Sequence, residues 1–537
     1  MSKSSVSVRT GRRYRPNRLN GPYDAIIIGS GIGGLTTAAC LAKMGKKICV
    51  LEQHYTAGGF THAYERNGYE WDVGVHYLGE MGNPHSISRK IFDHISDGSL
   101  QWASMGTEVD RLHLGDKTFE IVSGRKAYRD KLVEYFPEEK DAIDKYMTYL
   151  QQSNAAIRKL AIDKILPRTA SSILSKLAPG EPPEYANFKT REVLESLTKN
   201  QQLIAVMAGQ WGDNGLPPAE SSFIIHSMIA QHYMRGGFYP IGGASQIARS
   251  IIPVIQSSDG EVFTYASVKN ILTDKGITRG VVMEDGTEIP CNTVISNAGV
   301  FNTFNKLIDD VTLAQPYHEK TTQVERSAAS ACLYIGLQKS AQELRLPKTN
   351  FWIYPSENYE ADMAAYHKDN SADLPLAYIS FPSAKDPSFA DRVPGKATIE
   401  IVALETPGMF DQWKDTEWGK RGKDYEAIKE AFSQRLLKKL YEKMPHLEGQ
   451  IDYYELSTSL STAHFCGYEA GEIYGLNHNP QRFEQDWLKP QTDIPGLYLT
   501  GQDVMTCGVV GAMMGGLLTA VKLGGLKGLG LAKAMLL

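Results

Sequence analysis

The chain has 537 residues, of which 42% are hydrophobic and 22% charged, the balance of an ordinary globular protein. This length allows roughly two to four domains with sizeable cores. A net charge of −4, with no long basic stripe beyond the N-terminus, argues against nucleic acid as a main partner. The six cysteines lack paired or C-x-x-C spacing, which favours reduced thiols and a cytoplasmic location over a disulfide frame or a metal site.

Residues 1–21 carry six basic side chains and no acidic one among Ser, Asn, Gly and Pro. Such a composition predicts a disordered basic arm. No apolar h-region follows it, so a secretory signal is not expected. The sequence also lacks a run of about 18 apolar residues, so no transmembrane helix is expected.

A dinucleotide-binding unit is predicted next. The apolar run Ala25–Ile28 favours a buried parallel strand that stops at a glycine. A G-x-G-x-x-G fingerprint, a helix over Leu35–Met44 and a second strand over Lys47–Leu51 follow, with Glu52 placed to bind a ribose 2′-OH. The fingerprint permits a tight turn, close approach to a pyrophosphate and close helix packing, at a helix N-terminus with free N–H groups. The fingerprint glycines are Gly29, Gly31 and Gly34, and Gly33 lies just before the last of them.

Two further glycines distinguish the cofactor. Gly58 and Gly59 complete the pattern E-x5-G-G after Glu52, which resembles flavoproteins that hold FAD rather than NAD dehydrogenases. FAD is therefore the predicted cofactor, and Gln53 is included among the residues expected to contact it.

A hairpin is predicted from Tyr64–Arg66 to Tyr69–Val73, because Asn67-Gly68 is a strong two-residue turn signal. The strand and loop after it carry His76 and Tyr77. In FAD oxidoreductases with this opening, such a segment lies against the isoalloxazine ring. His76 and Tyr77 are thus candidate proton donors, and a purely structural hydrogen-bonding role is the alternative.

The middle of the chain predicts strands within 102–122 and helices over Pro137–Leu166, Arg191–Gln210 and Ala219–Met234. This apolar and aromatic block suits a domain that encloses a long hydrophobic substrate, although an ordinary helical core would look the same. A β-meander follows from 261 to 296. In it, Val268 is expected to offer its backbone to an adenine, and Asn297 to end a strand near the cofactor.

The C-terminal part predicts the far side of the same site. A strand over 497–499 leads to Gly501 and Asp503, and Asp503 is expected to bind the ribityl or pyrophosphate region. The helix that begins near Gly508 would direct its positive N-terminus at the flavin, where negative charge gathers on reduction. The residues at this N-terminus are Val510, Gly511 and Ala512. The tail 526–537 is expected either to touch a membrane interface or to pack as a terminal helix.

With these segments in view, the chain resembles the phytoene desaturase-type FAD-dependent oxidoreductases of the amine-oxidase superfamily, and within them the retinol saturase and carotenoid isomerase branch. The resemblance implies an α/β fold with α+β insertions: a discontinuous Rossmann-type FAD domain over 22–83, 237–300 and 491–525, and a mixed sheet-and-helix substrate domain over 84–236 and 301–490. The segments that carry it are GSGIGGL (29–35), VLEQHYTAGGF (50–60), DVGVHYLG (72–79), HYMRGGFYPIGGASQIA (232–248), VISNAG (294–299) and LYLTGQDVMTCGVVGAMMGG (497–516).

The resemblance also implies a function. It predicts an FAD-dependent enzyme that saturates one C=C bond of a retinoid or carotenoid taken from a membrane surface, with Tyr77 or His76 as the acid. Only one dinucleotide fingerprint is present, so electrons are expected from an external donor. The alternatives are redox-neutral cis–trans isomerisation of a carotenoid, desaturation, and a non-catalytic lipid- or prenyl-binding protein related to Rab escort proteins.

Overall fold

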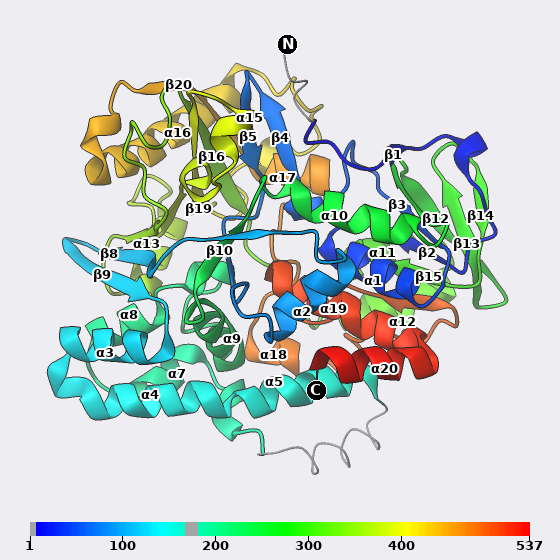
Figure 1. The fold of residues 1–537 in the computed structure, drawn as a ribbon, viewed down its shortest axis with the longest axis horizontal. Coiled ribbons are helices and arrows are strands. Elements are labelled where there is room, and N and C mark those ends of the chain that lie inside the picture. The colour runs from blue at the N-terminus through cyan, green and yellow to red at the C-terminus, as the bar shows by residue number, and fades with distance from the viewer. Residues whose placement is uncertain (1–6, 167–180, 537) are drawn as a thin grey trace.

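The computed structural model describes residues 7–166 and 181–536, which form two halves built on different sheets (Figure 1). The first half contains a six-stranded, all-parallel sheet in the order β1-β11-β3-β2-β15-β21. Its central strands are buried throughout, as expected for a parallel sheet covered on both faces. The strands are β1 (Arg12–Arg13), β11 (Glu261–Thr264), β3 (Ile48–Leu51), β2 (Ala25–Ile28), β15 (Val294–Ser296) and β21 (Leu497–Leu499).

Three helices cover one face of this sheet: α1 (Ile32–Lys43), α10 (Ser245–Gln256) and α19 (Gly508–Leu523). Small residues let α1 approach α19 and its preceding loop. A Cβ on Gly33 would lie 2.4 Å from Cα of Gly501, and one on Gly516 would lie 2.4 Å from the carbonyl oxygen of Gly33. The first and last parts of the chain therefore meet backbone to backbone.

The second half contains a seven-stranded sheet in the order β20-β16-β19-β18-β17-β8-β9, antiparallel except for the β17–β8 pair. Helix α16 (Lys423–Lys443) packs its apolar side on one face of this sheet. A second hydrophobic cluster joins strands β8, β9, β17 and β18 to five helices: α3 (Arg125–Tyr135), α4 (Lys140–Gln152), α7 (Thr190–Leu197), α8 (Gln201–Ala208) and α9 (Phe223–Tyr233). The strands are β20 (Ile451–Ser457), β16 (Ser330–Leu337), β19 (Ala397–Leu404), β18 (Ala377–Ser380), β17 (Asn350–Tyr354), β8 (Glu108–Leu114) and β9 (Lys117–Val122).

Smaller elements join the halves. The hairpin of β4 (Ala63–Arg66) and β5 (Tyr69–Asp72) confirms the turn predicted at Asn67-Gly68, and β5 lies against β19 of the large sheet. The other strands are β6 (Leu78–Gly79), β7 (Trp102–Ser104), β10 (Gly237–Pro240), β12 (Val268–Asp274), β13 (Ile277–Met283) and β14 (Glu288–Pro290). The remaining helices are α2 (Ile87–Ile95), α5 (Asn154–Ile165), α11 (Val300–Asn305), α12 (Val311–Thr321), α13 (Tyr359–Lys368), α14 (Pro382–Lys385), α15 (Phe389–Arg392), α17 (Ser459–Cys466), α18 (Pro480–Phe483) and α20 (Gly525–Leu536).

The N-terminal arm differs from the sequence expectation. Within the stretch expected to be disordered, Arg12–Arg13 pairs with the open edge of β11, because unpaired backbone groups there accept another strand. The pairing is extended by a hydrogen bond from the amide of Tyr14 to the carbonyl of Thr264 at 2.8 Å. An ion pair of 3.1 Å between Arg12 and Glu261 adds to it. The domain boundaries proposed from the resemblance stay a prediction.

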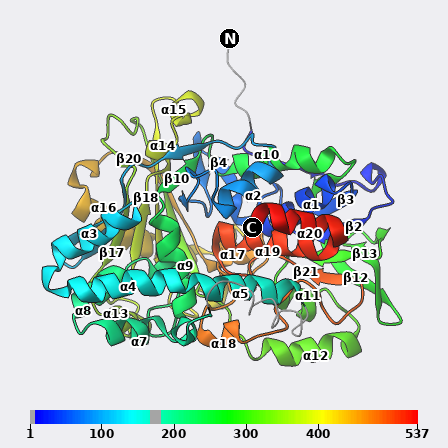
Figure 2. The same cartoon turned by 60° about the horizontal axis from the view of Figure 1, so that its bottom comes forward.

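Helix α20 lies on the surface of the first half, and α4 and α5 run one after the other towards α19 (Figure 2). The single helix expected over Pro137–Leu166 is divided at Ser153 into α4 and α5. None of the helices in the described part of the chain combines the length and apolar character needed to cross a bilayer.

Candidate functional site

A cavity of about 1050 Å³ runs from the glycine-rich turn of the first half into the large sheet of the second. One end is lined by backbone and small residues around β2, β3 and α1. The other end is walled by large apolar or aromatic side chains of the seven-stranded sheet, among them Trp352, Leu376, Tyr378 and Leu404. A single space therefore joins a nucleotide-type cradle to an apolar chamber.

Most of the predicted cofactor residues lie on this cavity. Those that line it are Gly29, Gly31, Gly33, Glu52, Gln53, Gly58, Gly59, Val268, Asn297, Asp503 and Ala512. The other four, Gly34, Gly501, Val510 and Gly511, are not among its lining residues. The three glycines serve packing behind the wall: a Cβ on Gly34 would lie 2.2 Å from the carbonyl oxygen of Gly29, and one on Gly511 would lie 2.4 Å from that of Thr506.

The glycine cradle fits a pyrophosphate. Gly29 has φ of +92° and Gly58 has φ of +125°, conformations that side chains rarely adopt. A Cβ on Gly59 would lie 2.9 Å from Cα of Gly31, so the two turns touch through their backbones. Helix α1 begins after Gly31 without a side-chain cap, which leaves its first N–H groups free for an anion at this end of the cavity.

Glu52 stands at the end of β3, as predicted, and both of its oxygens accept hydrogen bonds. Oε2 accepts from the amide and hydroxyl of Ser30 at 2.8 and 2.7 Å, and Oε1 accepts from the amide of His54 at 2.9 Å. The carboxylate therefore fixes the glycine turn, and Glu52 also lines the cavity, where its remaining acceptor capacity suits a ribose.

Asp503 carries an unsatisfied acceptor. Its Oδ2 accepts from the amide of Val300 at 2.8 Å, whereas the buried Oδ1 has no hydrogen-bond partner among the described residues. Burial raises the pKa of this carboxyl, and the nearby Arg482 guanidinium opposes that rise. Oδ1 lies against Gly475, where a Cβ would be 2.3 Å away. Asp503 also lines the cavity, so its carboxylate fits the hydroxyl groups of a ribityl chain or ribose.

The N-terminus of α19 borders the cavity beside Asp503. Gly508, Val509 and Ala512 line it, and the capping residue Cys507 leaves the first turn without a side-chain cap. Cys507 is buried, and that burial raises its pKa to about 12. The backbone amide of Cys507 donates to Nε2 of His478 at 2.9 Å. The free amides at this terminus are placed to stabilise negative charge on a bound ring.

The two predicted acids lie in different places. His76 lines the apolar end of the cavity, whereas Tyr77 does not. The hydroxyl of Tyr77 donates to Asp110 at 2.9 Å, and its ring stacks on Tyr233 with centroids 4.1 Å apart. Tyr77 is therefore one layer behind the wall.

His76 belongs to a buried polar network that the sequence analysis did not identify. Its Nδ1 lies 2.9 Å from Oε2 of Glu400, and Lys385 donates to its backbone carbonyl at 2.9 Å. Burial lowers the pKa of His76 to about 3, with Lys385 adding to the effect, and lowers that of Lys385 to about 7. Burial raises the pKa of Glu400 to about 8. A charged residue inside the apolar run ATIEIVAL was the only sequence signal for Glu400.

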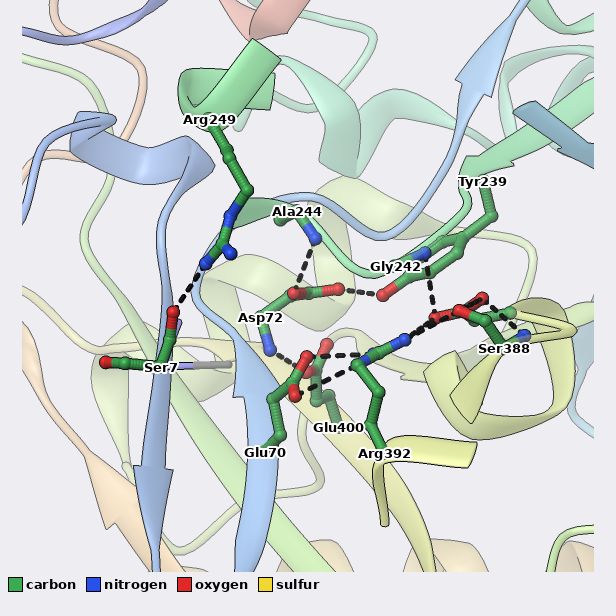
Figure 3. Close-up of polar contacts among 11 residues, drawn as sticks. Ser7, Glu70, Asp72, Tyr239, Gly242, Ala244, Arg249, Ser388, Arg392 and Glu400 are labelled. Carbon is green, nitrogen blue, oxygen red and sulfur yellow. Dashed lines mark hydrogen bonds and ion pairs between the residues drawn. The ribbon is translucent and has the colours of Figure 1, made fainter. Parts of the chain in front are cut away.

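The same network continues to Asp72, as Figure 3 shows. The amide of Asp72 donates to Oε1 of Glu400 at 3.0 Å, and its Oδ1 accepts from the amide of Ala244 at 2.9 Å. Beside it, Arg392 binds Glu70 at 2.9 Å and Asp386 at 2.7 Å. These contacts tie β5, β19 and the start of α10 together behind the cavity.

Comparison with known proteins agrees with this architecture. The family of NAD(P)-binding Rossmann-like domains matches residues 27–95. A cyclohexylamine oxidase from Brevibacterium oxydans has a similar fold, with a TM-score of 0.56 at 13% identity over 96% of this chain and all of that one. The predicted fold class is thereby confirmed.

Three relatives cover nearly the whole sequence. An all-trans-retinol 13,14-reductase from Danio rerio is 36% identical over 94% of this chain and 86% of its own. A protein from the same fish named inactive all-trans-retinol 13,14-reductase is 32% identical over 95% and 87%. A chloroplastic prolycopene isomerase from Daucus carota is 26% identical over 93% and 79%. The predicted resemblance is confirmed, and this chain belongs to the all-trans-retinol 13,14-reductase family of oxidoreductases.

Proposed function

We propose that this protein is an FAD-dependent oxidoreductase that saturates one C=C bond of a retinoid-like polyene. The observation that carries the proposal is the single cavity that joins the glycine cradle to an apolar chamber. A long apolar alkene can lie in the chamber while a dinucleotide cofactor occupies the cradle, so that their reactive parts meet. The name of the 36% identical relative supports the retinoid class.

FAD is proposed as the cofactor, supported by the E-x5-G-G pattern, the two positive-φ glycines and the free oxygen of Asp503. When bound, the flavin supplies or accepts a hydride. The protein's share is to hold the pyrophosphate at the start of α1, direct the start of α19 at the ring, and exclude water with the apolar wall. The lack of a second dinucleotide fingerprint supports an external electron donor.

The test is turnover by the purified protein with its flavin reduced under anaerobic conditions. All-trans-retinol should yield a product heavier by two hydrogens, with the flavin reoxidised. An unchanged mass with altered chromatographic retention would instead support isomerisation, the activity in the name of the carrot relative. A yellow protein that turns over no polyene would place this chain with the relative named inactive.

A peripheral membrane contact through α20 is also proposed, since the substrate class is lipid-soluble. Leu526 and Leu529 are 88% and 60% exposed, and Lys527 and Lys533 lie on the same short helix. The compartment is proposed to be one that keeps thiols reduced, because the six cysteines are free. The Leu526→Ser/Leu529→Ser variant should sediment less with anionic vesicles, whereas Val311→Ser, which removes an exposed apolar residue (71%) of α12, should not.

A further inference from the structure

One acidic residue on the cavity has no part in the sites described so far. Asp213 ends the 3₁₀ helix η5 (Trp211–Asp213) and lines the cavity together with Gly212. On one side, a Cβ on Gly212 would lie 2.6 Å from Trp352 and 2.7 Å from Leu376 in the apolar chamber. On the other, the backbone carbonyl of Asp213 is 3.5 Å from the thiol of Cys507 at the start of α19. Asp213 thus stands where the chamber meets the cofactor end.

The groups that shift the pKa of Asp213 include no cation. Its Oδ2 is buried and has no hydrogen-bond partner among the described residues. Burial and the neighbouring Asp110 raise its pKa well above the ordinary value, while the hydroxyls of Tyr77 and Tyr233 lower it by less. Such surroundings favour the protonated, neutral form of the carboxyl.

Asp110 shows the contrasting environment. It accepts hydrogen bonds from Tyr77 at 2.9 Å, Gln210 at 2.6 Å and Asn350 at 2.9 Å. Burial raises the pKa of Asp110 too, but the three donors oppose that rise, so Asp213 is the carboxyl whose protonated form is favoured more strongly. Adjacent carboxyls in unlike surroundings have pKa values that are pushed apart, which assigns the acid role to one of them.

We propose that Asp213 is the catalytic acid that protonates one carbon of the alkene, an inference that rests on the proposed function. In the balanced step a reduced flavin, when bound in the cradle, would supply a hydride to one alkene carbon and lose two electrons. The carboxyl O–H of Asp213 breaks as a C–H bond forms at the other carbon, and the resulting carboxylate regains a proton from water.

His76 and Tyr77, the donors favoured by the sequence, occupy positioning roles in this scheme. Nδ1 of His76 is engaged by Glu400, and its lowered pKa leaves a neutral imidazole, a far weaker acid than a carboxyl. Tyr77 has no place on the cavity lining and gives its hydroxyl hydrogen to Asp110.

The test compares the wild type, Asp213→Asn and Asp213→Glu as FAD-loaded proteins, with Asp116→Asn on an exposed hairpin turn as the matched control. We expect Asp213→Asn to lower kcat by about 100-fold or more, with the retinol affinity, read by fluorescence quenching, changed less than about threefold. Asp213→Glu, which keeps a carboxyl, should restore part of the rate. In heavy water, the wild-type product should carry deuterium at the carbon that the acid protonates.

A second measurement needs no turnover. Infrared spectra of the wild type at neutral pH should contain the C=O band of a protonated carboxylic acid that is missing in Asp213→Asn and present in Asp116→Asn. Absence of that band from the wild type would overturn the proposal. So would a rate of Asp213→Asn within about threefold of a wild type that forms the two-hydrogen product, an outcome that leaves the proposed function standing. A wild type that reduces no polyene would overturn both the role of Asp213 and the proposed function.

Discussion

At the scale of single residues, Asp503 offers the clearest link between an unsatisfied atom and cofactor binding. One oxygen accepts from Val300, and the other is buried without a donor. We predict that Asp503→Asn places N–H groups where a hydroxyl donor should bind, and weakens FAD retention about tenfold to a hundredfold, the cost of losing a charge-assisted hydrogen bond. The flavin-to-protein absorbance ratio after dialysis measures this, with Asp116→Asn as the control. Equal retention by both variants would contradict it.

The proton on Asp213 has a consequence for stability as well. The folded-state pKa of this carboxyl is raised above the ordinary value of 3.8, so its contribution to the free energy of unfolding is full below that value. The contribution is lost as pH rises through the folded pKa, by at most about 1.4 kcal/mol per pH unit. Asp213→Asn should therefore gain stability over the wild type as pH increases, and the gain should level off above that pKa.

Denaturant unfolding of both proteins from about pH 4 to about pH 9 measures the difference. The titratable groups around Asp213 are present in both chains, so the pH-dependent difference isolates its carboxyl and the coupling to Asp110; these groups are Asp110, Tyr77, Tyr233, Tyr354, Tyr378, Tyr474 and Cys507. A difference that is constant over this range would show that the carboxyl titrates normally.

At the scale of elements, the contact of α1 with α19 holds the two ends of the cofactor site in register. A Cβ at Gly516 would lie 2.4 Å from the backbone of Gly33 and 2.8 Å from Cβ of Thr36. We predict that Gly516→Ala lowers the free energy of unfolding by about 1–3 kcal/mol through overpacking, despite its better helix propensity. Gly530→Ala, with open space around its Cβ in α20, should instead be neutral or stabilising by up to about 1 kcal/mol. Equal stability of the two variants would contradict the prediction.

Elements with strong local signals could be predicted, and those set by side chains from elsewhere could not. The strand–glycine–helix–strand unit and the Asn67-Gly68 hairpin depend on residues close in sequence, and both form as expected. The run Arg191–Gln210, expected as one helix, is divided because the side chain of Asn200 accepts from the amide of Leu203 and starts α8. Helix α17, which the sequence analysis did not predict, is started by the capping residue Thr458.

At the scale of the whole molecule, residues at the glycine end of the cavity could be predicted from the sequence, and most of those at the apolar end could not. Glycine turns and a terminal Asp are visible in short motifs, and the resemblance placed them in one domain. Asp213, Glu400 and Lys385 carry no motif: Asp213 lines the cavity, and Glu400 and Lys385 bind His76 on its wall, because distant strands and turns converge there. Tyr77 shows why the sequence alone could not choose between neighbours. It follows His76 directly, yet His76 lines the cavity and the hydroxyl of Tyr77 binds Asp110 behind the wall.

The same scale yields a last prediction, on how the two halves are held together. Arg392 binds the nearly buried carboxylates of Glu70 on β5 and Asp386 next to α14, at 2.9 and 2.7 Å. Arg392→Ala leaves both acids without a cation. Removing one partner of a buried pair costs about 3–5 kcal/mol, and the guanidinium here is partly exposed, so we expect a loss of about 2 kcal/mol in denaturant unfolding.

Lys420→Ala is the matched control, because Lys420 and its partner Glu417 are both 70% exposed and their pair should contribute less than about 1 kcal/mol. Since Glu70 adjoins Asp72 and the strand that leads to His76, Arg392→Ala should also loosen the apolar end of the cavity and weaken retinol binding. Flavin retention should stay at the wild-type level, because the glycine cradle and Asp503 lie at the other end. Loss of flavin together with retinol binding would mean that Arg392 supports the whole fold and not the junction between its halves.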